Sequence, residues 1–406
     1  MKRELLAVDV AARIVLDGVS ALEPELVPLE ESGGRHTVVD VKSQVDLPGF
    51  DNSVMDGYAL IAADTSKATA DSPVELDLVG ESRAGNPFAG ELVTGQACGI
   101  STGAMIPEGA DAVLQKEMVK VIGERIRIAD RVEAGRDIRR RGEVTRAGET
   151  VLPASSRIGP VEIGAMAATG TSEVSCHRWP RVSLLTSGDE LVEPGQRLGP
   201  GQIWNSNQFA LTELIRSAPA ELVSTEVVPD GLDATVAALD RALSADLTVI
   251  SGGVSVGRHD HVRPALAKLG VEQDFWGLAL KPGRPTWFGR RGDSRVIGVP
   301  GNPVSALVVF RMLAMPLLQI LAGGPEPGPR PVFRLASPVE RLRSRMWAVP
   351  CHPAGGGQPD TLEPMPQLGS HDFLSLIGAT HLALVEAGTG RVEAGDPVET
   401  VSMSAG

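Results

Sequence analysis

Hydrophobic and polar residues follow two different rhythms along the 406 residues of the chain. From Arg181 to about Gly324, short β-branched apolar runs alternate with amphipathic stretches at helical spacing, which predicts a largely parallel sheet with helices on both faces. From Tyr58 to about residue 135, short apolar runs lie between Gly, Asp and Pro residues, which predicts an all-β region. The expected strands of the parallel sheet are Val182–Leu185, Leu222–Val228, Leu247–Ile250, Phe275–Leu280 and Val296–Val299, and its expected helices are Gln208–Ser217, Asp233–Leu243, Val262–Leu269 and Pro303–Leu321.

The remaining segments divide the chain into further domains. Apolar residues at helical spacing predict an amphipathic helix within Leu6–Leu22, ending near Pro24. Partly helical sequence returns around Ile158–Ala168, so we interpret the all-β region as an insertion between two halves of one small domain. A proline-rich linker begins near Pro325 and leads into a small β domain. The predicted class is thus an α/β multidomain protein with a small mixed linker domain (residues 1–47 and 141–178), a β-rich insertion domain (48–140), an αβα domain with a mainly parallel sheet (179–324) and a C-terminal β domain (325–406).

Glycine and polar residues follow the end of each expected strand of the αβα domain. In open α/β sheets, ligands bind at the edge where the parallel strands end. The segment SGGVSVG (251–257) lets an anion approach the main chain closely, although it is neither a Walker loop nor a dinucleotide fingerprint. The residues predicted to gather at this edge are Ser187, Gly188, Asp189 and Glu190; Asp230; Ser251, Gly252, Gly253, Ser255, Gly257 and Asp260; Lys281 and Arg284; and Pro300, Gly301, Asn302 and Pro303.

Charges of both signs occur in this set. Lys281 and Arg284 bring positive charge that suits an oxyanion. A single carboxylate is at least as well explained by a helix cap or a surface charge, so the prediction of a site rests on the whole set. Arg139 belongs to a basic run, IRRRGE (138–143), that either lies in solvent or meets an anion. The carboxylates that together suit Mg²⁺ are Asp189, Glu190, Asp230 and Asp260.

Composition excludes several classes of protein. The net charge of −13 argues against a general nucleic-acid surface. The three cysteines, Cys98, Cys176 and Cys351, have no metal-ligand spacing, which is typical of a reduced cytoplasmic protein. Asp9 and Arg13 interrupt the first apolar run, so no signal peptide is expected, and no segment is expected to approach the length of a membrane span.

Seven motifs, in order along almost the whole chain, resemble the MoeA/gephyrin E-domain family of molybdopterin molybdotransferases. They are PGFDNSVMDGYA (48–59), TGAMIPEGADAV (102–113), IRRRGE (138–143), TSGDEL (186–191), SGGVSVGRHD (251–260), KPGRP (281–285) and PGNPVSA (300–306). The resemblance implies that the αβα domain binds molybdopterin and is similar to molybdopterin adenylyltransferases, one of which is the expected pathway partner. It also implies an elongated homodimer with each active cleft between the αβα domain of one subunit and the β insertion of the other.

The reaction implied by the resemblance joins adenylylated molybdopterin to molybdate and releases AMP with the help of a divalent cation. Asp56 and Thr102 would reach the cleft from the partner subunit, and Glu190, Asp230 and Asp260 would serve metal and pyrophosphate chemistry. The SGGVSVG main chain and the PGNP segment would hold the pterin nucleotide. The residues that would position molybdate are Lys281, Arg284 and Ser305.

The chain departs from the family pattern at three positions. Val144 stands where the family usually has Asp, Arg284 replaces a lysine, and Val349 stands where an arginine commonly follows an aromatic residue. Two other functions therefore stay open at this point: a diverged paralogue that binds the precursor with weak or no catalysis, and a scaffold protein. We expect Val144 either to weaken cation binding or to pack under its loop while Glu143 supplies the missing charge.

Overall fold

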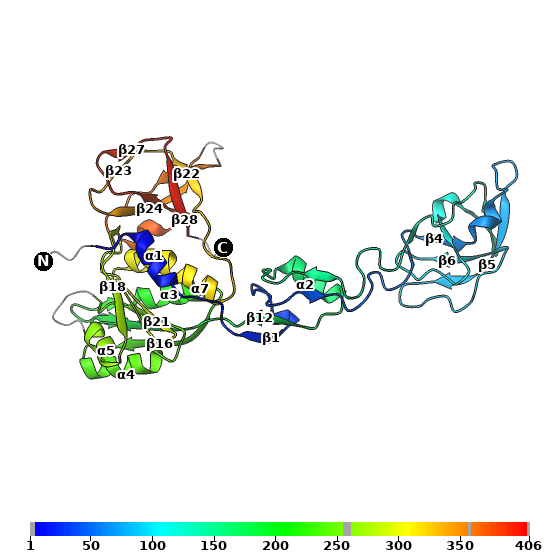
Figure 1. Cartoon of the computed structure of the whole chain (residues 1–406). Coiled ribbons are helices and arrows are strands. Elements are labelled where there is room, and N and C mark those ends of the chain that lie inside the picture. The colour runs from blue at the N-terminus through cyan, green and yellow to red at the C-terminus, as the bar shows by residue number, and fades with distance from the viewer. Residues whose placement is uncertain (1–4, 255–260, 356–358, 404–406) are drawn as a thin grey trace. The chain divides into compact units, whose positions relative to one another are not determined.

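The computed structural model of this chain describes residues 5–254, 261–355 and 359–403. The chain forms two compact units: unit 1 contains residues 1–25, 34–38 and 175–406, and unit 2 contains residues 26–33 and 39–174 (Figure 1). The α/β multidomain class expected from the sequence is confirmed, with mixed sheets and a β-rich C-terminal region. The finer division into four domains stays a prediction.

The centre of unit 1 is a six-stranded sheet of order β16-β13-β17-β21-β20-β18. The first four of these strands run parallel, and β20 pairs antiparallel with both β21 and the edge strand β18. Every residue of β17 is buried, including the polar Thr248 and Ser251, as expected of a central strand covered on both faces. The strands are β13 (Arg181–Ser187), β16 (Glu221–Val228), β17 (Leu247–Ser251), β18 (Glu272–Trp276), β20 (Trp287–Arg291) and β21 (Ser294–Val299).

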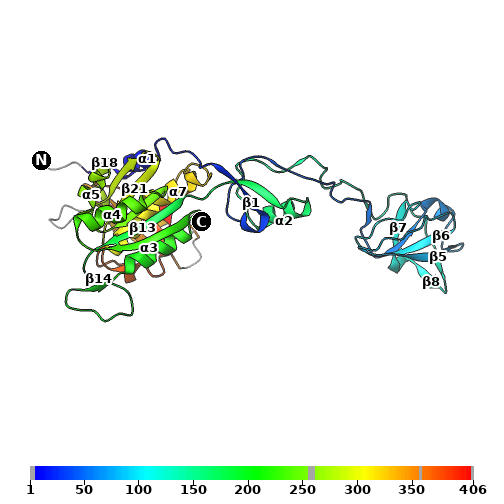
Figure 2. The same cartoon turned by 90° about the horizontal axis from the view of Figure 1, so that it is seen from below.

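Helices cover both faces of this sheet because the buried strands carry apolar side chains on both sides. Leu184 and Val249 belong to the core of one face, while their neighbours Leu185 and Ile250 belong to the core of the other. Figures 1 and 2 show α4 (Leu232–Ala242) and α5 (Val262–Lys268) on the second face. The first face carries α1 (Val8–Leu16), α3 (Ser206–Arg216), α6 (Pro303–Val309) and α7 (Met315–Leu321).

Three expected elements of unit 1 differ from the structure. The first helix ends at Leu16 rather than near Pro24, and Gly18 then takes a positive φ of 65°, which stops the helical pattern. The expected strand Phe275–Leu280 is wrong, because β18 ends at Trp276 and runs antiparallel at the edge of the sheet. The segment Trp287–Arg291, for which no strand was expected, forms β20.

The helix Pro303–Leu321 corrects the expectation that no segment approaches the length of a membrane span. It has 19 residues and a mean hydropathy of 2.0, but 83% of it is buried inside the protein. Its middle, Phe310–Ala314, is a π-helical turn between α6 and α7. The segment is mostly apolar because it packs into the core of unit 1, as seen for α7 beside α1 in Figure 1.

The C-terminal part of unit 1 is a second six-stranded sheet, of order β19-β24-β25-β22-β28-β26, with a further pairing of β24 to β26. A short parallel pair joins β14 (Leu191–Val192) to β15 (Ile203–Trp204), and β23 (Val339–Glu340) pairs with β27 (Arg391–Val392). The strands of the sheet are β19 (Leu280–Lys281), β22 (Val332–Leu335), β24 (Met346–Pro353), β25 (Thr361–Pro364), β26 (His381–Val385) and β28 (Pro397–Ser402), and η5 (Phe373–Leu376) is a single turn.

Unit 2 is built around a six-stranded sheet of order β7-β4-β6-β5-β9-β8, which agrees with the all-β pattern expected there. The helix α2 (Pro160–Ala168) begins with a proline in its first turn, where the missing N–H is not needed. The strands of the sheet are β4 (Gly57–Leu60), β5 (Val74–Ser82), β6 (Gln96–Ile100), β7 (Ala112–Gln115), β8 (Lys120–Ile122) and β9 (Arg125–Ile128). The shorter elements are β2 (Val41–Lys42) with β11 (Thr150–Leu152), β3 (Asn52–Ser53) with β10 (Ile138–Arg139), β1 (Pro24–Pro28) with β12 (Glu173–His177), and the turns η1 (Leu29–Glu31), η2 (Ala62–Thr65) and η3 (Lys116–Met118).

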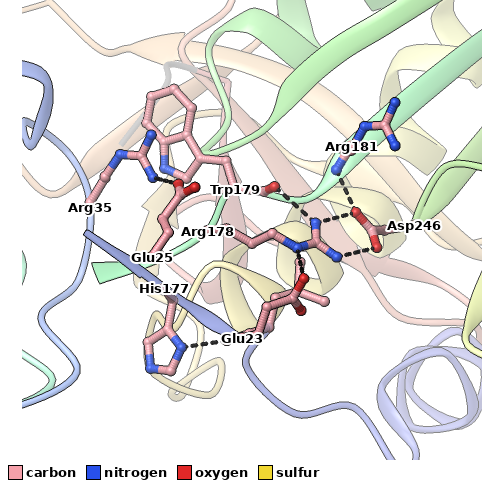
Figure 3. Close-up of polar contacts among 9 residues, drawn as sticks. Glu23, Glu25, Arg35, His177, Arg178, Trp179, Arg181 and Asp246 are labelled. Carbon is pink, nitrogen blue, oxygen red and sulfur yellow. Dashed lines mark hydrogen bonds and ion pairs between the residues drawn. The ribbon is translucent and has the colours of Figure 1, made fainter. Parts of the chain in front are cut away.

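A network of ion pairs in unit 1 surrounds Arg178, just before β13 (Figure 3). The Arg178 guanidinium donates to both carboxylate oxygens of Asp246, at 2.7 and 2.8 Å, and to Glu23 at 2.5 Å. Burial raises the pKa of Asp246, but hydrogen bonds from Arg178 and from the Arg181 amide outweigh it and hold that pKa below its usual value. The network fixes the start of β13 beside the start of β17.

The three cysteines are free and buried. Burial raises the pKa of Cys351 to about 12 and those of Cys98 and Cys176 to about 11, so all three thiols stay protonated at neutral pH. Within the described residues, none of the three thiols forms a disulfide or belongs to a group of side chains that could hold a metal ion.

Candidate functional site

The side chain of Asn207, in the first turn of α3, joins the ends of β17 and β21, and the loop after β17 approaches the end of β13. Its amide nitrogen donates to the Ser251 hydroxyl at 2.8 Å and to the Gly301 carbonyl at 2.7 Å. Gly252 has a φ of +87°, and a Cβ there would lie 2.6 Å from the Ser187 carbonyl oxygen. Only glycine therefore allows this approach of two loops. The structure thus brings the predicted residues of three loops together.

The loop after β13 carries Gly188, Asp189 and Glu190. A Cβ on Gly188 would lie 2.4 Å from a carboxylate oxygen of Glu190, so the glycine makes room for that carboxylate. Asp189 accepts a hydrogen bond of 2.8 Å from the amide of Asp230, which ties this loop to the one after β16. Glu190 is exposed, and its carboxylate has no hydrogen bond or ion pair with the described residues. Asp189 therefore holds the loop in place, and the Glu190 carboxylate is available to a ligand.

Lys281 belongs to a different sheet from the one expected, and Arg284 lies on the loop after it. Lys281 lies on β19, which pairs with β24 of the C-terminal sheet, so it does not follow the end of a parallel strand. Its ammonium lies 4.2 Å from the centroid of the Trp347 ring. Arg284 is exposed on the loop that follows. Neither cation forms an ion pair with the part of the chain that the structure describes, so both charges are available to an anion.

The PGNP segment leads into α6. Asn302 occupies the N-cap position without accepting a capping hydrogen bond. Its amide donates instead to the Ser370 hydroxyl at 2.7 Å, and the Ser370 carbonyl accepts the amide of Val304 at 3.2 Å. Pro300 is buried, Gly301 and Asn302 are exposed, and Pro303 is partly buried. Ser305, predicted to position molybdate, is only 3% exposed within the helix.

In unit 2, Asp56 and Thr102 form one closed contact. One oxygen of the exposed Asp56 carboxylate accepts the Thr102 amide at 2.7 Å and the Thr102 hydroxyl at 2.8 Å. Lys116 lies 4.0 Å from the other oxygen. The hydrogen bonds from the Thr102 amide and hydroxyl lower the pKa of Asp56, so it is ionised at neutral pH. The two predicted residues are thus brought together within one unit.

The basic run on β10 contains two neutralised arginines and one that is not. Arg140 pairs with Asp51 at 2.6 Å and Arg141 with Asp46 at 2.7 Å. Arg139 has only a 3.5 Å contact to the side-chain oxygen of Asn52. Of these three side chains, Arg139 is therefore the one that keeps its charge for an anion.

Val144, just after this run, does not pack under its loop. Its side chain is 68% exposed, so that expectation is wrong. The Glu143 carboxylate accepts a hydrogen bond of 2.8 Å from the Arg140 amide and therefore stabilises the turn of residues 140–143. In the C-terminal sheet, the departure at Val349 is a core residue, 3% exposed. An arginine there would place a charge in the interior.

The predicted ligand set for Mg²⁺ is not assembled in the described part of the chain. Within residues 5–254, 261–355 and 359–403, no three His, Cys, Asp or Glu side chains are grouped closely enough to hold a metal ion. Ser255, Gly257 and Asp260, which were predicted for this site, lie outside the described residues. Glu190 and Asp230 alone do not make a cation site, and we assign no chemical step to a metal ion.

Three residues of this region were missed from the sequence. Asn207 follows the N-cap Asn205 by two positions, and a second asparagine in a first helical turn is a signal that was available. Trp347 and Ser370 gave no local signal, because their importance depends on which strands and loops lie beside them.

A mainly parallel sheet with a glycine-rich loop edge, a β-rich second unit and a C-terminal sheet define a multidomain α/β protein. Residues 6–170 match the MoeA N-terminal region (domain I and II), and residues 183–320 match a probable molybdopterin binding domain. A molybdopterin molybdenumtransferase of Haemophilus influenzae is 35% identical over 93% of both chains, and one of Synechococcus elongatus is 34% identical over 98% of this chain and 100% of its own. The crystal structure of the molybdopterin biosynthesis MoeA protein from Pyrococcus horikosii has a TM-score of 0.82 at 31% identity and covers 99% of this chain and 100% of its own.

The chain therefore belongs to the MoeA family of molybdopterin molybdenumtransferases. The resemblance of the seven motifs is confirmed. The similarity extends over almost the whole length of enzymes, and it does not favour the alternatives of a binding-only paralogue or a scaffold.

Proposed function

We propose that this protein is a molybdopterin molybdotransferase of molybdenum cofactor biosynthesis, which inserts the metal of molybdate into adenylylated molybdopterin and releases AMP. The observation that carries the proposal is the edge at Asn207, where Ser251 and Gly301 are joined beside the glycine loop. Such an edge suits the phosphates of a nucleotide. Family membership supports this choice of nucleotide.

In this proposal the residues of the chain have separate tasks. The main chain around Gly252 and the Asn207 bridge bind and orient the pterin nucleotide. Lys281 and Arg284 attract molybdate, a dianion, since no carboxylate of the described residues neutralises them. Glu190, open and ionisable, acts on the phosphate side, where the bond to AMP is cleaved.

The direct test is the release of AMP by the purified protein from adenylylated molybdopterin. Release that depends on molybdate supports the proposal, and tight binding of the precursor without turnover would contradict it in favour of a binding protein. Retention of full function in a strain complementation assay by a chain that neither binds nor converts the precursor would indicate a scaffold.

We also propose Mg²⁺ as the divalent cation, with Glu190, Asp230 and Asp260 as its ligands, on the basis of the family resemblance. Hard carboxylate oxygens suit this ion. If the proposal is right, chelation by EDTA stops AMP release and added Mg²⁺ restores it. Unchanged release in EDTA would contradict it.

The working state we propose is a cytoplasmic homodimer in which Asp56 and Thr102 of one subunit complete the cleft of the other, with a molybdopterin adenylyltransferase as the upstream partner. Asp56→Asn and Glu190→Gln chains, each with lowered activity alone, are then expected to recover activity when they are co-expressed. One cleft of the mixed dimer carries neither change. Mixed dimers that form but are no more active than the two variants alone would contradict a shared site.

A further inference from the structure

We propose that Trp347 is a positioning residue that holds the Lys281 ammonium in place, un-neutralised, to receive molybdate. This inference rests on the proposed function of the chain. It assigns a task to an aromatic residue of the C-terminal sheet whose ring lies against the ammonium of a predicted site residue.

The pairing of two strands forces this contact. β19 and β24 are parallel, with Leu280 opposite Met346 and Lys281 opposite Trp347. Leu280 is fully buried and Met346 is 6% exposed, both in the core of the first face. Because successive side chains of a strand point to opposite faces, Lys281 and Trp347 lie together on the other face.

The ring face is what Trp347 contributes. The Lys281 ammonium lies 4.2 Å from the ring centroid, within the range of a cation–π contact. The indole Nε1–H is buried and has no hydrogen-bond partner among the described residues. A buried donor without a partner is unfavourable, so the indole N–H does not explain a tryptophan at this position. A phenylalanine would keep the face and lose only an N–H that donates to nothing described.

A second pair in the same unit shows what a purely structural contact of this kind looks like. Arg35 lies 4.9 Å from the ring centroid of Trp179, whose Nε1–H is also buried without a partner in the described chain. Arg35, however, forms an ion pair with Glu25 (Figure 3). Its charge is therefore neutralised, whereas that of Lys281 is not.

The difference between a ring and a carboxylate decides the function of the contact. A carboxylate beside Lys281 would fix the ammonium but cancel its charge. The ring quadrupole attracts the ammonium without adding a negative charge. A lysine held in this way keeps its attraction for an oxyanion and has already lost much of its side-chain freedom before the anion binds.

The chain has only seven lysines, which makes the contact measurable without any turnover. Reductive ¹³C-dimethylation labels each ammonium and keeps its charge, and the Lys281→Arg variant identifies the Lys281 signal by its absence. In the unmodified sequence we expect the Lys281 methyl signal to be shifted upfield by the Trp347 ring and to move on titration with molybdate alone. In Trp347→Leu the upfield shift is lost, and in Trp347→Phe most of it remains.

The same titrations give the affinity. We expect Trp347→Leu to bind molybdate roughly three- to tenfold more weakly and Trp347→Phe to stay within about threefold of the original chain. In turnover, Trp347→Leu raises the KM for molybdate by a similar factor and changes kcat less. The matched control is Trp179→Leu, which removes the ring beneath Arg35 and leaves molybdate affinity unchanged.

Two results would overturn the inference. One is a Lys281 signal that does not respond to molybdate in the original chain. The other is an equal molybdate affinity in Trp347→Leu. Failure of the proposed function gives a different pattern, because the shift, the molybdate response and the loss in Trp347→Leu then persist in a protein that releases no AMP.

Discussion

The two units place their candidate acids in opposite electrostatic states. In unit 2, Asp56 accepts two hydrogen bonds from Thr102 and has Lys116 nearby. Of the three consecutive arginines 139–141, two are paired with aspartates. In unit 1, Glu190 and Arg284 have no such partner among the described residues. The charged groups of the unit 2 site are mostly paired with each other, whereas Glu190 and Arg284 of unit 1 have no partner among the described residues.

This difference distinguishes carboxylates that hold a loop in place from carboxylates that are free to act on a ligand. A carboxylate that caps a loop keeps that loop in place, and its replacement by an amide preserves much of the geometry. An open carboxylate beside glycine loops contributes little to the folded state but is free to act on a ligand. The predictions below test whether the open charges are the functional ones.

The largest effect is expected at Glu190. Glu190→Gln removes an ionisable group from the open edge and is expected to lower AMP release by about 100-fold, the lower part of the range for a lost acid–base group. Its free energy of unfolding stays within about 0.5 kcal/mol, since the side chain contacts little. Single-turnover AMP assays and thermal unfolding measure both. The matched control is Glu193→Gln, an exposed acid just beyond β14. Normal release by Glu190→Gln would remove this residue from the mechanism.

A paired acid in the same unit provides the contrast. Asp246→Asn removes the charge that Arg178 and the Arg181 amide hold and is expected to cost about 2–3 kcal/mol of stability. Asp77→Asn breaks the exposed pair of Asp77 with Arg125 and is expected to cost at most about 1 kcal/mol. Denaturant unfolding compares the two variants. Equal costs would show that the Arg178 network does not stabilise the fold.

The stability difference between the original chain and Asp246→Asn is expected to depend on pH in one direction. The folded state lowers the pKa of Asp246, so its carboxylate stabilises the protein fully above the unfolded-state pKa of about 3.9. This contribution is lost as the pH falls through the lower pKa of the folded state. The stability difference between the original chain and Asp246→Asn is therefore constant above about pH 5 and shrinks in stronger acid. A difference that grows in acid would contradict this assignment.

A smaller effect is expected at Asp56. Asp56→Asn keeps an oxygen that can accept from the Thr102 amide and hydroxyl, so the loop stays ordered and AMP release falls only about tenfold. Asp56→Ala removes the acceptor as well and exposes the Thr102 amide to faster hydrogen exchange. The exchange rate of that amide and the activity are measured together. If Asp56→Asn loses as much activity as Glu190→Gln, the contrast between closed and open acids fails.

Much of this fold was predictable from local patterns. The runs that became β13, β16, β17 and β21 are short, apolar and bounded by turn residues, and the helices between them repeat at helical spacing. The edge of the unit 1 sheet was harder to predict. Phe275–Leu280 reads as one apolar strand, yet it divides between an antiparallel edge strand and a different sheet. Sequence periodicity contains no information about which partner a strand finds.

The candidate site shows the same division. The glycine and carboxylate residues after β13 and β17 were predictable because parallel strands must end at one edge. Asn207, Trp347 and Ser370 were not predicted, since each acts through a neighbour distant in sequence. Lys281 was predicted as a cation of the site for the wrong structural reason.

The smallest change in stability is expected at Val144, the exposed departure from the family. Because its side chain is 68% exposed, Val144→Asp places the new carboxylate in solvent and changes the free energy of unfolding by less than about 0.5 kcal/mol. If unit 2 contributes to the proposed cation requirement, the added carboxylate lowers the Mg²⁺ concentration for half-maximal AMP release and leaves the dependence on molybdate unchanged, since affinity for hard cations follows the number of carboxylates. The exposed Val121→Asp variant is the control for an added surface charge in the same unit. If both variants give the same Mg²⁺ titration as the original chain, the acid missing at Val144 has no part in cation binding. Unit 2 would then contribute only through the shape of its Asp56 loop.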